Sequence, residues 1–389
     1  MSAELPPKKL SFGHWFALGF LFALALSVAL LSHFGFAEQL REQLWKQGPV
    51  VEAADFPAGV TSPAYERASL ILRPTLIGTT LRGSTAPLLW AAGGDNEEGE
   101  EGLWSQSFAT DVRVHVFQNS TELSEALAKG GDNGGVDMAV LSMSTLLLGA
   151  PELKPASPRV LMLMGWSRGQ DVLVATQGLH HPAQLRGKRV AVEMWSPGHH
   201  LLLWTLSRAG LRLSELELLA LDSALEAATV LESGAADAAA GLYGELLPWT
   251  LQHKGEFLES TADVPHLVAS VLVARGSFVA RYPEVVVRVL RGIFELEQNM
   301  GRYRKRLHKG FAQKYPELRK PEQLLQEEPL ASMEENLAFF GLQGHAAVGY
   351  AELYQSTLTL ASKLYERPPG PSVEESLELT PLKRITQRR

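Results

Sequence analysis

A polar loop leaves a short apolar strand and opens a helix within the segment Leu185–Leu211. The pattern predicts a strand at Arg189–Val192 and a helix at His199–Ala209. Ser196 fits the N-cap position, where its hydroxyl accepts a backbone N–H of the first turn, and Pro197 fits the first helical position. Ligands of open α/β sheets bind at the carboxyl ends of strands, and helix starts favour negative groups. The loop is therefore a candidate binding site, although an ordinary strand-to-helix turn has the same pattern.

Further polar and aromatic side chains stand at the ends of other predicted strands. If two halves of the chain face each other, these side chains converge on one crevice of small hydrogen-bonding groups and aromatic walls. Each of them could instead cap a helix or fill the core. The candidate ligand-binding residues are Thr80, Ser84, Thr85, Ser142, Trp166, Trp195, Ser196, Gly198, His199, Asp222 and Tyr243.

Residues 165–169 match the G-x-S-x-G pattern of a nucleophilic serine. That pattern requires a strand before it and a helix after it, so that the serine lies on an exposed turn. Residues 170–176 (QDVLVAT) have a strand pattern instead. The segment is therefore interpreted as a crossover between two lobes, and no catalytic residue is assigned.

Two histidine pairs, His180-His181 and His199-His200, could suggest a metal site. Adjacent side chains point in different directions, and no carboxylate stands at helical ligand spacing from either pair. No metal site and no cofactor are expected. The basic run at Arg302–Lys309 is a solvated helix face or, in a chain held at a membrane, a surface for anionic lipids or an acidic partner.

The remaining pattern alternates short strands with helices. A first strand is expected at 70–72 or 76–78 and leads into a helix from Leu88. Further strands are expected at 112–117, 137–141, 160–164, 171–176, 189–192, 216–221 and 268–274. Further helices are expected at 120–129, 199–209, 224–232, 283–299, 302–314, 321–326, 333–340 and 346–365.

A pattern that occurs twice in the chain indicates two lobes. A helix ends at Gly130 and a turn enters the strand that begins with Asp137. A second helix ends at Gly234 and a turn enters a strand after Asp237. The repetition favours an α/β fold with two similar lobes, each made of strand–helix units.

Composition restricts the function further. The chain has 389 residues, a formal net charge of -7 and no cysteine. The negative charge argues against nucleic acid as a partner. The absence of cysteine excludes disulfides, thiolate metal sites and a lipid anchor on cysteine.

The amino-terminal segment predicts export. Lys8 and Lys9 precede an apolar run that extends from Phe12 to Phe36 and is long enough to cross a bilayer, which needs about 20 residues. We expect an uncleaved transmembrane helix with the folded body in the periplasm or outside the cell. A cleaved signal peptide, with a small-residue site around Gly35–Ala37, is the alternative.

The expected domain organisation follows from these elements. Residues 1–36 form a cytoplasmic stub and anchor, and residues 37–68 form a tether rich in proline. Lobe 1 comprises residues 69–168 and 276–366, and lobe 2 comprises residues 169–275. Residues 367–389 are expected to be a polar, mobile tail after Pro368–Pro371.

Taken in order, short motifs resemble the type II periplasmic solute-binding proteins of ABC importers, in their sulfonate, taurine and nitrate branch. The resemblance covers about Leu70 to Tyr365. It is carried by Gly78 with Thr85-Ala86-Pro87, Gly135-Val136-Asp137-Met138-Ala139, Leu185–Val192, Ser233–Ala238 and Tyr282-Pro283-Glu284-Val285.

The resemblance implies two lobes, joined by two crossovers, that close on a small and often anionic solute. The residues that match the binding loops of these proteins are Thr80, Ser84, Thr85, Ser142, Ser196, Gly198 and His199. The chain departs from the pattern because no arginine stands in the loop 195–200, although Arg82 lies in the first loop. Glu193 beside the loop would disfavour an anion unless its side chain points away.

The resemblance, together with the apolar amino-terminal run, predicts a non-enzymatic, membrane-anchored monomer that passes a small organic molecule, anionic in many such proteins, to an ABC permease. An anchored sensor or regulatory subunit with the same binding lobes is the alternative. An enzyme on the same scaffold, similar to pyrimidine-precursor synthases, is a third reading, which the absence of their cysteine-rich motif disfavours.

Overall fold

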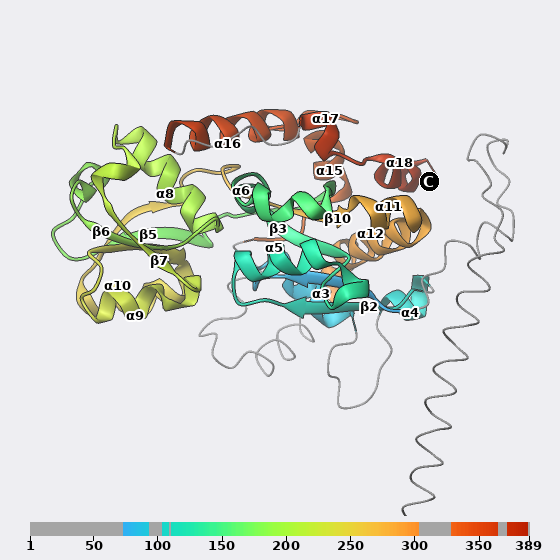
Figure 1. Ribbon diagram of the computed structural model, residues 1–389, viewed down its shortest axis with the longest axis horizontal. Coiled ribbons are helices and arrows are strands. Elements are labelled where there is room, and N and C mark those ends of the chain that lie inside the picture. Colours follow the sequence, from blue (N-terminus) through green and yellow to red (C-terminus); the bar gives the residue numbers. More distant parts are fainter. Residues whose placement is uncertain (1–72, 93–102, 109, 303–327, 365–371, 388–389) are drawn as a thin grey trace, which may run out of the picture. The chain divides into compact units, whose positions relative to one another are not determined.

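The computed structural model describes residues 73–92, 103–108, 110–302, 328–364 and 372–387 (Figure 1). All of them belong to one compact unit, Pro63–Arg389. The predicted anchor and tether lie outside the described residues, as does the basic run beyond Arg302. Within the described ranges, no helix combines the length and apolar character that crossing a bilayer requires.

The first sheet has five strands in the order β2-β1-β3-β10-β4. Strand β1 runs parallel to β2 and β3, whereas β10 runs antiparallel to β3 and β4. The strands are β1 (Thr75–Thr79), β2 (Val112–Val116), β3 (Met138–Ser142), β4 (Pro158–Trp166) and β10 (Ala269–Arg275).

The second sheet repeats this arrangement in the order β7-β6-β8-β5-β9. Strand β6 runs parallel to β7 and β8, and β5 runs antiparallel to β8 and β9. The strands are β5 (Asp171–Ala175), β6 (Arg189–Glu193), β7 (Glu217–Leu221), β8 (Ala238–Leu242) and β9 (Glu256–Ser260). The chain crosses between the sheets twice, after β4 and after β9, so the predicted α/β fold with two lobes and two crossovers is confirmed.

Helices connect the strands and cover the sheets. In the first lobe they are α3 (Ala86–Ala91), α4 (Leu103–Phe108), α5 (Ser120–Lys129), α6 (Met143–Leu148), α7 (Ala150–Leu153), α11 (Gly276–Arg281), α12 (Pro283–Gln298), α15 (Met333–Phe339), α16 (Tyr350–Leu364), α17 (Val373–Ser376) and α18 (Thr380–Thr386). In the second lobe they are α8 (Pro197–Arg208), α9 (Ala227–Glu232) and α10 (Tyr243–His253).

Successive side chains of β5 point to opposite faces of the second sheet and contribute to a core on each face. Leu173 packs in a cluster with Leu202 of α8, whereas Val172 and Val174 pack on the opposite face with Trp249 of α10. Successive side chains of a strand point to opposite faces, so a run of apolar residues requires cover on both. Figure 1 shows α8 on one face of this sheet and α9 and α10 on the other.

The first sheet is covered in the same way. Met138 and Val140 of β3 belong to the cluster that contains α12, and Ala139 and Leu141 belong to the cluster that contains α5 and α16. These side chains are at most 3% exposed. Each lobe is thus a three-layer α/β unit with its own core.

Two expected boundaries are wrong. The strand β10, which the sequence placed in lobe 2, pairs with β3 and β4 in the first sheet. The described part of the expected mobile tail is folded, because Leu382 of α18 is completely buried against the α12 side of the core. Arg384 also forms an ion pair of 2.7 Å with Glu284, and the Glu378 N–H donates to the Val160 carbonyl at 3.0 Å.

Helix α16 joins the two lobes. Its residues Leu360 and Ala361 form one buried cluster with Leu148 of α6 and Leu203 of α8. The cluster thus connects the end of α6 in the first lobe with the middle of α8 in the second.

The packing of α4 against α12 depends on a glycine. A Cβ atom at Gly292 would lie 2.0 Å from Nε1 of Trp104, an indole that is 1% exposed and donates to the Val289 carbonyl at 3.1 Å. We expect Gly292→Val to lower the free energy of unfolding by about 1–3 kcal/mol, the usual cost of overpacking. Thermal unfolding of the full chain measures the change.

Gly244→Ala serves as the control, because a Cβ atom at this helical glycine of α10 meets no atom within 4 Å. Its unfolding temperature should equal or slightly exceed that of the unsubstituted chain. Equal unfolding temperatures for Gly292→Val and the unsubstituted chain would contradict the packing described here.

Candidate functional site

Two helix starts carry serines that the sequence singled out. Ser142 caps α6 and accepts the Thr145 N–H at 3.0 Å. Ser196 caps α8 and accepts the His199 N–H at 3.2 Å, so the predicted N-cap is confirmed. Both hydroxyls satisfy backbone donors that have no partner within the helix.

Side chains at the start of α6 donate to the loop that precedes α8 in the other lobe. Ser144 Oγ donates to the Ser196 carbonyl at 3.3 Å, and Thr145 Oγ1 donates to the Trp195 carbonyl at 3.0 Å. Trp195 has a φ of +64°, and its N–H donates to Nδ1 of His199 at 3.0 Å. The loop therefore holds a left-handed residue in place through contacts with its own helix and with the first lobe.

Glu193 ends β6 and points toward the first lobe rather than away. Its carboxylate accepts the Ser120 N–H at the start of α5 at 2.8 Å and the Ala224 N–H of its own lobe at 3.1 Å. Burial raises the pKa of Glu193, and the two backbone donors oppose this shift. A carboxylate of the chain thus occupies the helix start that could otherwise receive an anion.

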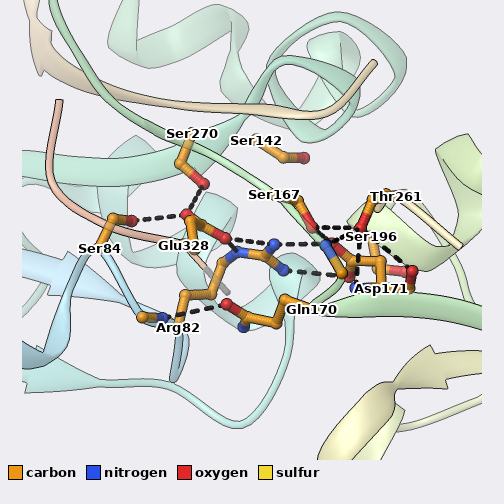
Figure 2. A network of polar contacts seen from close by, with 12 residues as sticks. Arg82, Ser84, Ser142, Ser167, Gln170, Asp171, Ser196, Thr261, Ser270 and Glu328 are labelled. Atoms are coloured by element: carbon orange, nitrogen blue, oxygen red, sulfur yellow. Dashed lines mark hydrogen bonds and ion pairs between the residues drawn. The ribbon is translucent and has the colours of Figure 1, made fainter. Parts of the chain in front are cut away.

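A buried guanidinium lies at the centre of the polar network shown in Figure 2. Arg82 donates through Nε to Glu328 at 2.6 Å, and through Nη2 and Nη1 to the two oxygens of Asp171 at 2.8 Å and 3.3 Å. Arg82 is 5% exposed, Asp171 1% and Glu328 0%. Burial lowers the pKa of Arg82, but the two carboxylates outweigh burial and raise it.

Hydroxyl groups complete the network. Ser84 Oγ and Ser270 Oγ each donate to Oε1 of Glu328 at 2.6 Å, and Ser167 Oγ donates to Asp171 at 2.7 Å. The carboxylates are therefore saturated from several sides, as burial of their charge requires.

The two crossovers are joined to each other in this network. Ser167 follows β4, Thr261 follows β9, and their hydroxyls lie 2.7 Å apart. Thr261 Oγ1 also accepts the Gly169 N–H at 3.0 Å. The two segments that connect the lobes are thus held to each other by hydrogen bonds.

Many predicted residues lie at contacts between the lobes or in the Arg82 network. Ser84 binds Glu328, and Thr85 Oγ1 accepts the Arg82 N–H at 3.1 Å and donates to the Thr80 carbonyl. Ser142, Trp195, Ser196 and His199 lie at the two facing helix starts.

Other predicted residues lie elsewhere. Trp166 packs edge-on against His266 and Phe339 at 5.0 Å and 5.5 Å between ring centroids. Tyr243 packs against Phe257, with ring centroids 5.8 Å apart. Asp222 is exposed after β7. The structure gives these residues no part in the described network.

Gly198 packs α8 onto its sheet. A Cβ atom at Gly198 would lie 3.3 Å from the backbone carbon of Ala240 and from the nitrogen of Gly241. A bulky side chain at Gly198 would press on the β8 backbone, so its replacement is expected to affect folding as well as the loop.

Sequence reasoning missed the partners of Arg82. Glu328 is separated from Arg82 by 246 positions and Asp171 by 89 positions, and no local pattern links them. The hydroxyls of Ser144 and Thr145 were also missed, although their position directly after the strand end at Ser142 is a recognisable signal.

Five buried side-chain polar atoms lack a hydrogen-bond partner among the described residues, and two of them lie near Asp171. These two are Nδ1 of His200, a side chain 2% exposed, and Nε2 of Gln170, a side chain 0% exposed. Gln170 Oε1 accepts the Gly83 N–H at 3.1 Å, next to Arg82 and Asp171 in Figure 2. Buried polar groups without partners are uncommon and indicate a place for a further group.

The other sequence motifs have structural explanations. Ser167 of the G-x-S-x-G pattern precedes strand β5 rather than a helix, and its hydroxyl is bonded to Asp171. His180 lies 3.1 Å from Glu256 at the surface. Within the part of the chain that the structure describes, no three His, Asp or Glu side chains are grouped to hold a metal ion.

Comparison with sequences gives partial matches. The family described as NMT1/THI5 like matches residues 111–295. A Brucella abortus protein, named only as a binding protein, is 28% identical over 205 residues, which are 51% of this chain and 60% of that protein. The chain therefore spans less than two thirds of this relative.

Comparison with solved structures identifies the fold. The alkanesulfonate-binding protein of Xanthomonas axonopodis pv. citri bound to MOPS is 21% identical, with a TM-score of 0.62, covering 79% of this chain and 98% of that protein. The periplasmic aliphatic sulphonate-binding protein of Escherichia coli is 17% identical, with a TM-score of 0.59, covering 78% of this chain and 92% of that protein.

The nitrate-binding protein of Synechocystis PCC 6803 is 14% identical, with a TM-score of 0.55, covering 81% of this chain and 85% of that protein. These similarities confirm the resemblance to type II periplasmic solute-binding proteins that the sequence predicted. Each of the proteins named here carries the name of a binding protein.

Replacement of Gly198 tests the packing of α8. We expect Gly198→Leu to lower the free energy of unfolding by about 1–3 kcal/mol, because the side chain must displace backbone atoms of β8. Thermal unfolding of the full chain measures this loss. A Gly198→Leu chain as stable as the parent would contradict the close packing of α8 on β8.

Burial of His200 predicts a pH dependence. Burial lowers the pKa of His200 from 6.5 to about 4, and the charge of Asp171 opposes this only in part. Between pH 6.5 and about pH 4, His200 binds a proton in the unfolded chain but not in the folded chain. The free energy of unfolding therefore falls as the pH falls. The total difference is about 3 kcal/mol.

Urea unfolding of the full chain from pH 7 to pH 4.5 measures this effect. His200→Gln should flatten the dependence, whereas replacement of the exposed His345 by Gln should leave it unchanged. The same slope in His200→Gln and in the parent chain would contradict the role of His200.

Proposed function

We propose that this chain, which has the two-lobed fold of type II periplasmic binding proteins, captures a small organic solute between its lobes for an ABC-type importer. The observation that carries the proposal is the meeting of both lobes at the starts of α6 and α8 and at Arg82. Ligands of such folds bind at strand ends, where these groups lie.

Binding is proposed to couple to a hinge motion of the lobes about the two crossovers. Opening would break the contacts of Ser120 with Glu193, of Thr145 with Trp195 and of Arg82 with Asp171. A solute that contacts both lobes would favour the closed arrangement by the difference between its affinities for the two states.

The setting in the cell follows from the amino-terminal segment. We infer that the chain is held in the cytoplasmic membrane by the apolar run after Lys9, with the folded body in the periplasm or outside the cell, where it acts as a monomer. Partner proteins would be the permease subunits of the importer, and no catalytic step is proposed.

Native mass spectrometry of the freshly purified full chain tests the proposal. We expect a small organic molecule bound in a one-to-one complex that denaturation releases. Thr145→Val removes a hydroxyl that donates to Trp195 across the lobes, so it should weaken retention by about fivefold, the effect of one hydrogen bond.

The matched control is Thr250→Val. Thr250 is also buried and donates within its own helix, to the Leu246 carbonyl at 2.8 Å, and this substitution should leave retention unchanged. A chain that carries no small molecule, with identical behaviour of both variants in titrations against extracts of small metabolites, would contradict solute binding.

A further inference from the structure

We propose that the solute carries a positively charged nitrogen and that Glu193 is the carboxylate that selects it. This inference deepens the proposed solute-binding function and rests on it.

Donors that could hold an anion are already used by carboxylates of the chain. Ser84 and Ser270 donate to Glu328, each at 2.6 Å. The Ser120 N–H at the start of α5 donates to Glu193 at 2.8 Å. An anionic solute would have to displace a buried carboxylate to reach any of these donors.

The guanidinium of Arg82 is likewise already bonded to carboxylates of the chain. Its Nε binds Glu328 and its two terminal nitrogens bind Asp171, in a side chain that is 5% exposed. Removing either carboxylate from this guanidinium would leave an uncompensated buried charge. Arg82 therefore serves the closed lobes and not the recognition of a sulfonate or carboxylate.

The charges of this contact region do not balance. Among the described residues of this region, the acidic groups of Asp171, Glu328 and Glu193 face the single guanidinium of Arg82, and burial raises the pKa of Glu193. His200 nearby adds no positive charge at neutral pH, because burial lowers its pKa to about 4. Buried charge without compensation is costly, so a cationic group next to Glu193 would be strongly favoured over an anion.

The two unpartnered atoms near Asp171, among five such buried atoms in the described residues, point to further groups of the solute. The neutral imidazole of His200 can accept an N–H or O–H at Nδ1, which has no partner among the described residues. Nε2 of Gln170 can donate to an oxygen of the solute. The chemical class is therefore a small amine or amidine that also carries an oxygen acceptor.

A set of probes with equal carbon skeleton and different charge tests the proposal. Butylammonium, butanol and butanesulfonate are titrated by calorimetry into the full chain after extensive dialysis. We expect butylammonium to bind most tightly and butanesulfonate at least about tenfold more weakly, the ratio that one charge-assisted hydrogen bond supplies.

The residue assignment is tested by Glu193→Gln, with Glu217→Gln as the matched control. Glu217 begins β7 beside Arg189, at the opposite ends of the parallel strands from Glu193. Glu193→Gln should weaken butylammonium binding by about tenfold and remove the preference over butanesulfonate, whereas Glu217→Gln should change neither.

The outcomes separate this inference from the proposed function. Tighter binding of butanesulfonate than of butylammonium would overturn the charge assignment and leave solute binding intact. Butylammonium binding unaffected by Glu193→Gln would overturn the role of Glu193. Absence of binding by every probe, together with absence of a co-purifying molecule, would overturn both proposals. The probe preference of the parent chain decides the charge assignment even if Glu193→Gln does not fold.

Discussion

The buried guanidinium of Arg82 is the interaction on which the arrangement of the two lobes depends. It lies in the loop after β1 and binds Asp171 at the start of β5 and Glu328 just before α15. These groups come from three distant segments, and each would be costly to bury alone. The first lobe, the first crossover and the segment before α15 therefore depend on one another, because the loss of one partner leaves the others as buried charges without compensation.

A second constraint acts at Glu193, where burial and hydrogen bonding oppose each other. Burial disfavours the charged carboxylate and raises its pKa, while the Ser120 and Ala224 amides stabilise the charge. The amide of Ser120 belongs to the other lobe, so the charged state of Glu193 is best stabilised when the lobes are in contact. Closure and the charge of this side chain are thus linked by the same hydrogen bond.

The scaffold around these contacts is built from a repeated unit. Both sheets place an antiparallel strand, β10 or β5, between the third parallel strand and the last strand, and both are covered on two faces by helices. Strand β5 follows the first crossover and β10 follows the second. The chain therefore enters each of these antiparallel strands directly from the other lobe. Helix α16 adds an apolar contact across the lobes through Leu360 and Leu203.

The sequence by itself determined the parts of this protein that depend on local chemistry. The apolar run of β6, the cap at Ser196 and the glycine-terminated helices that precede Asp137 and Asp237 were predictable, because propensity and capping act over a few residues. The repeated helix–strand pattern was enough to predict two α/β lobes.

Only the tertiary structure decided which groups meet. The pairing of Arg82 with Glu328, the direction of Glu193 toward α5, the close packing of Gly198 on β8 and the place of β10 in the first sheet all join segments far apart in the chain. Such contacts depend on burial and on the balance of charge in three dimensions. A one-dimensional pattern of residues does not contain that balance.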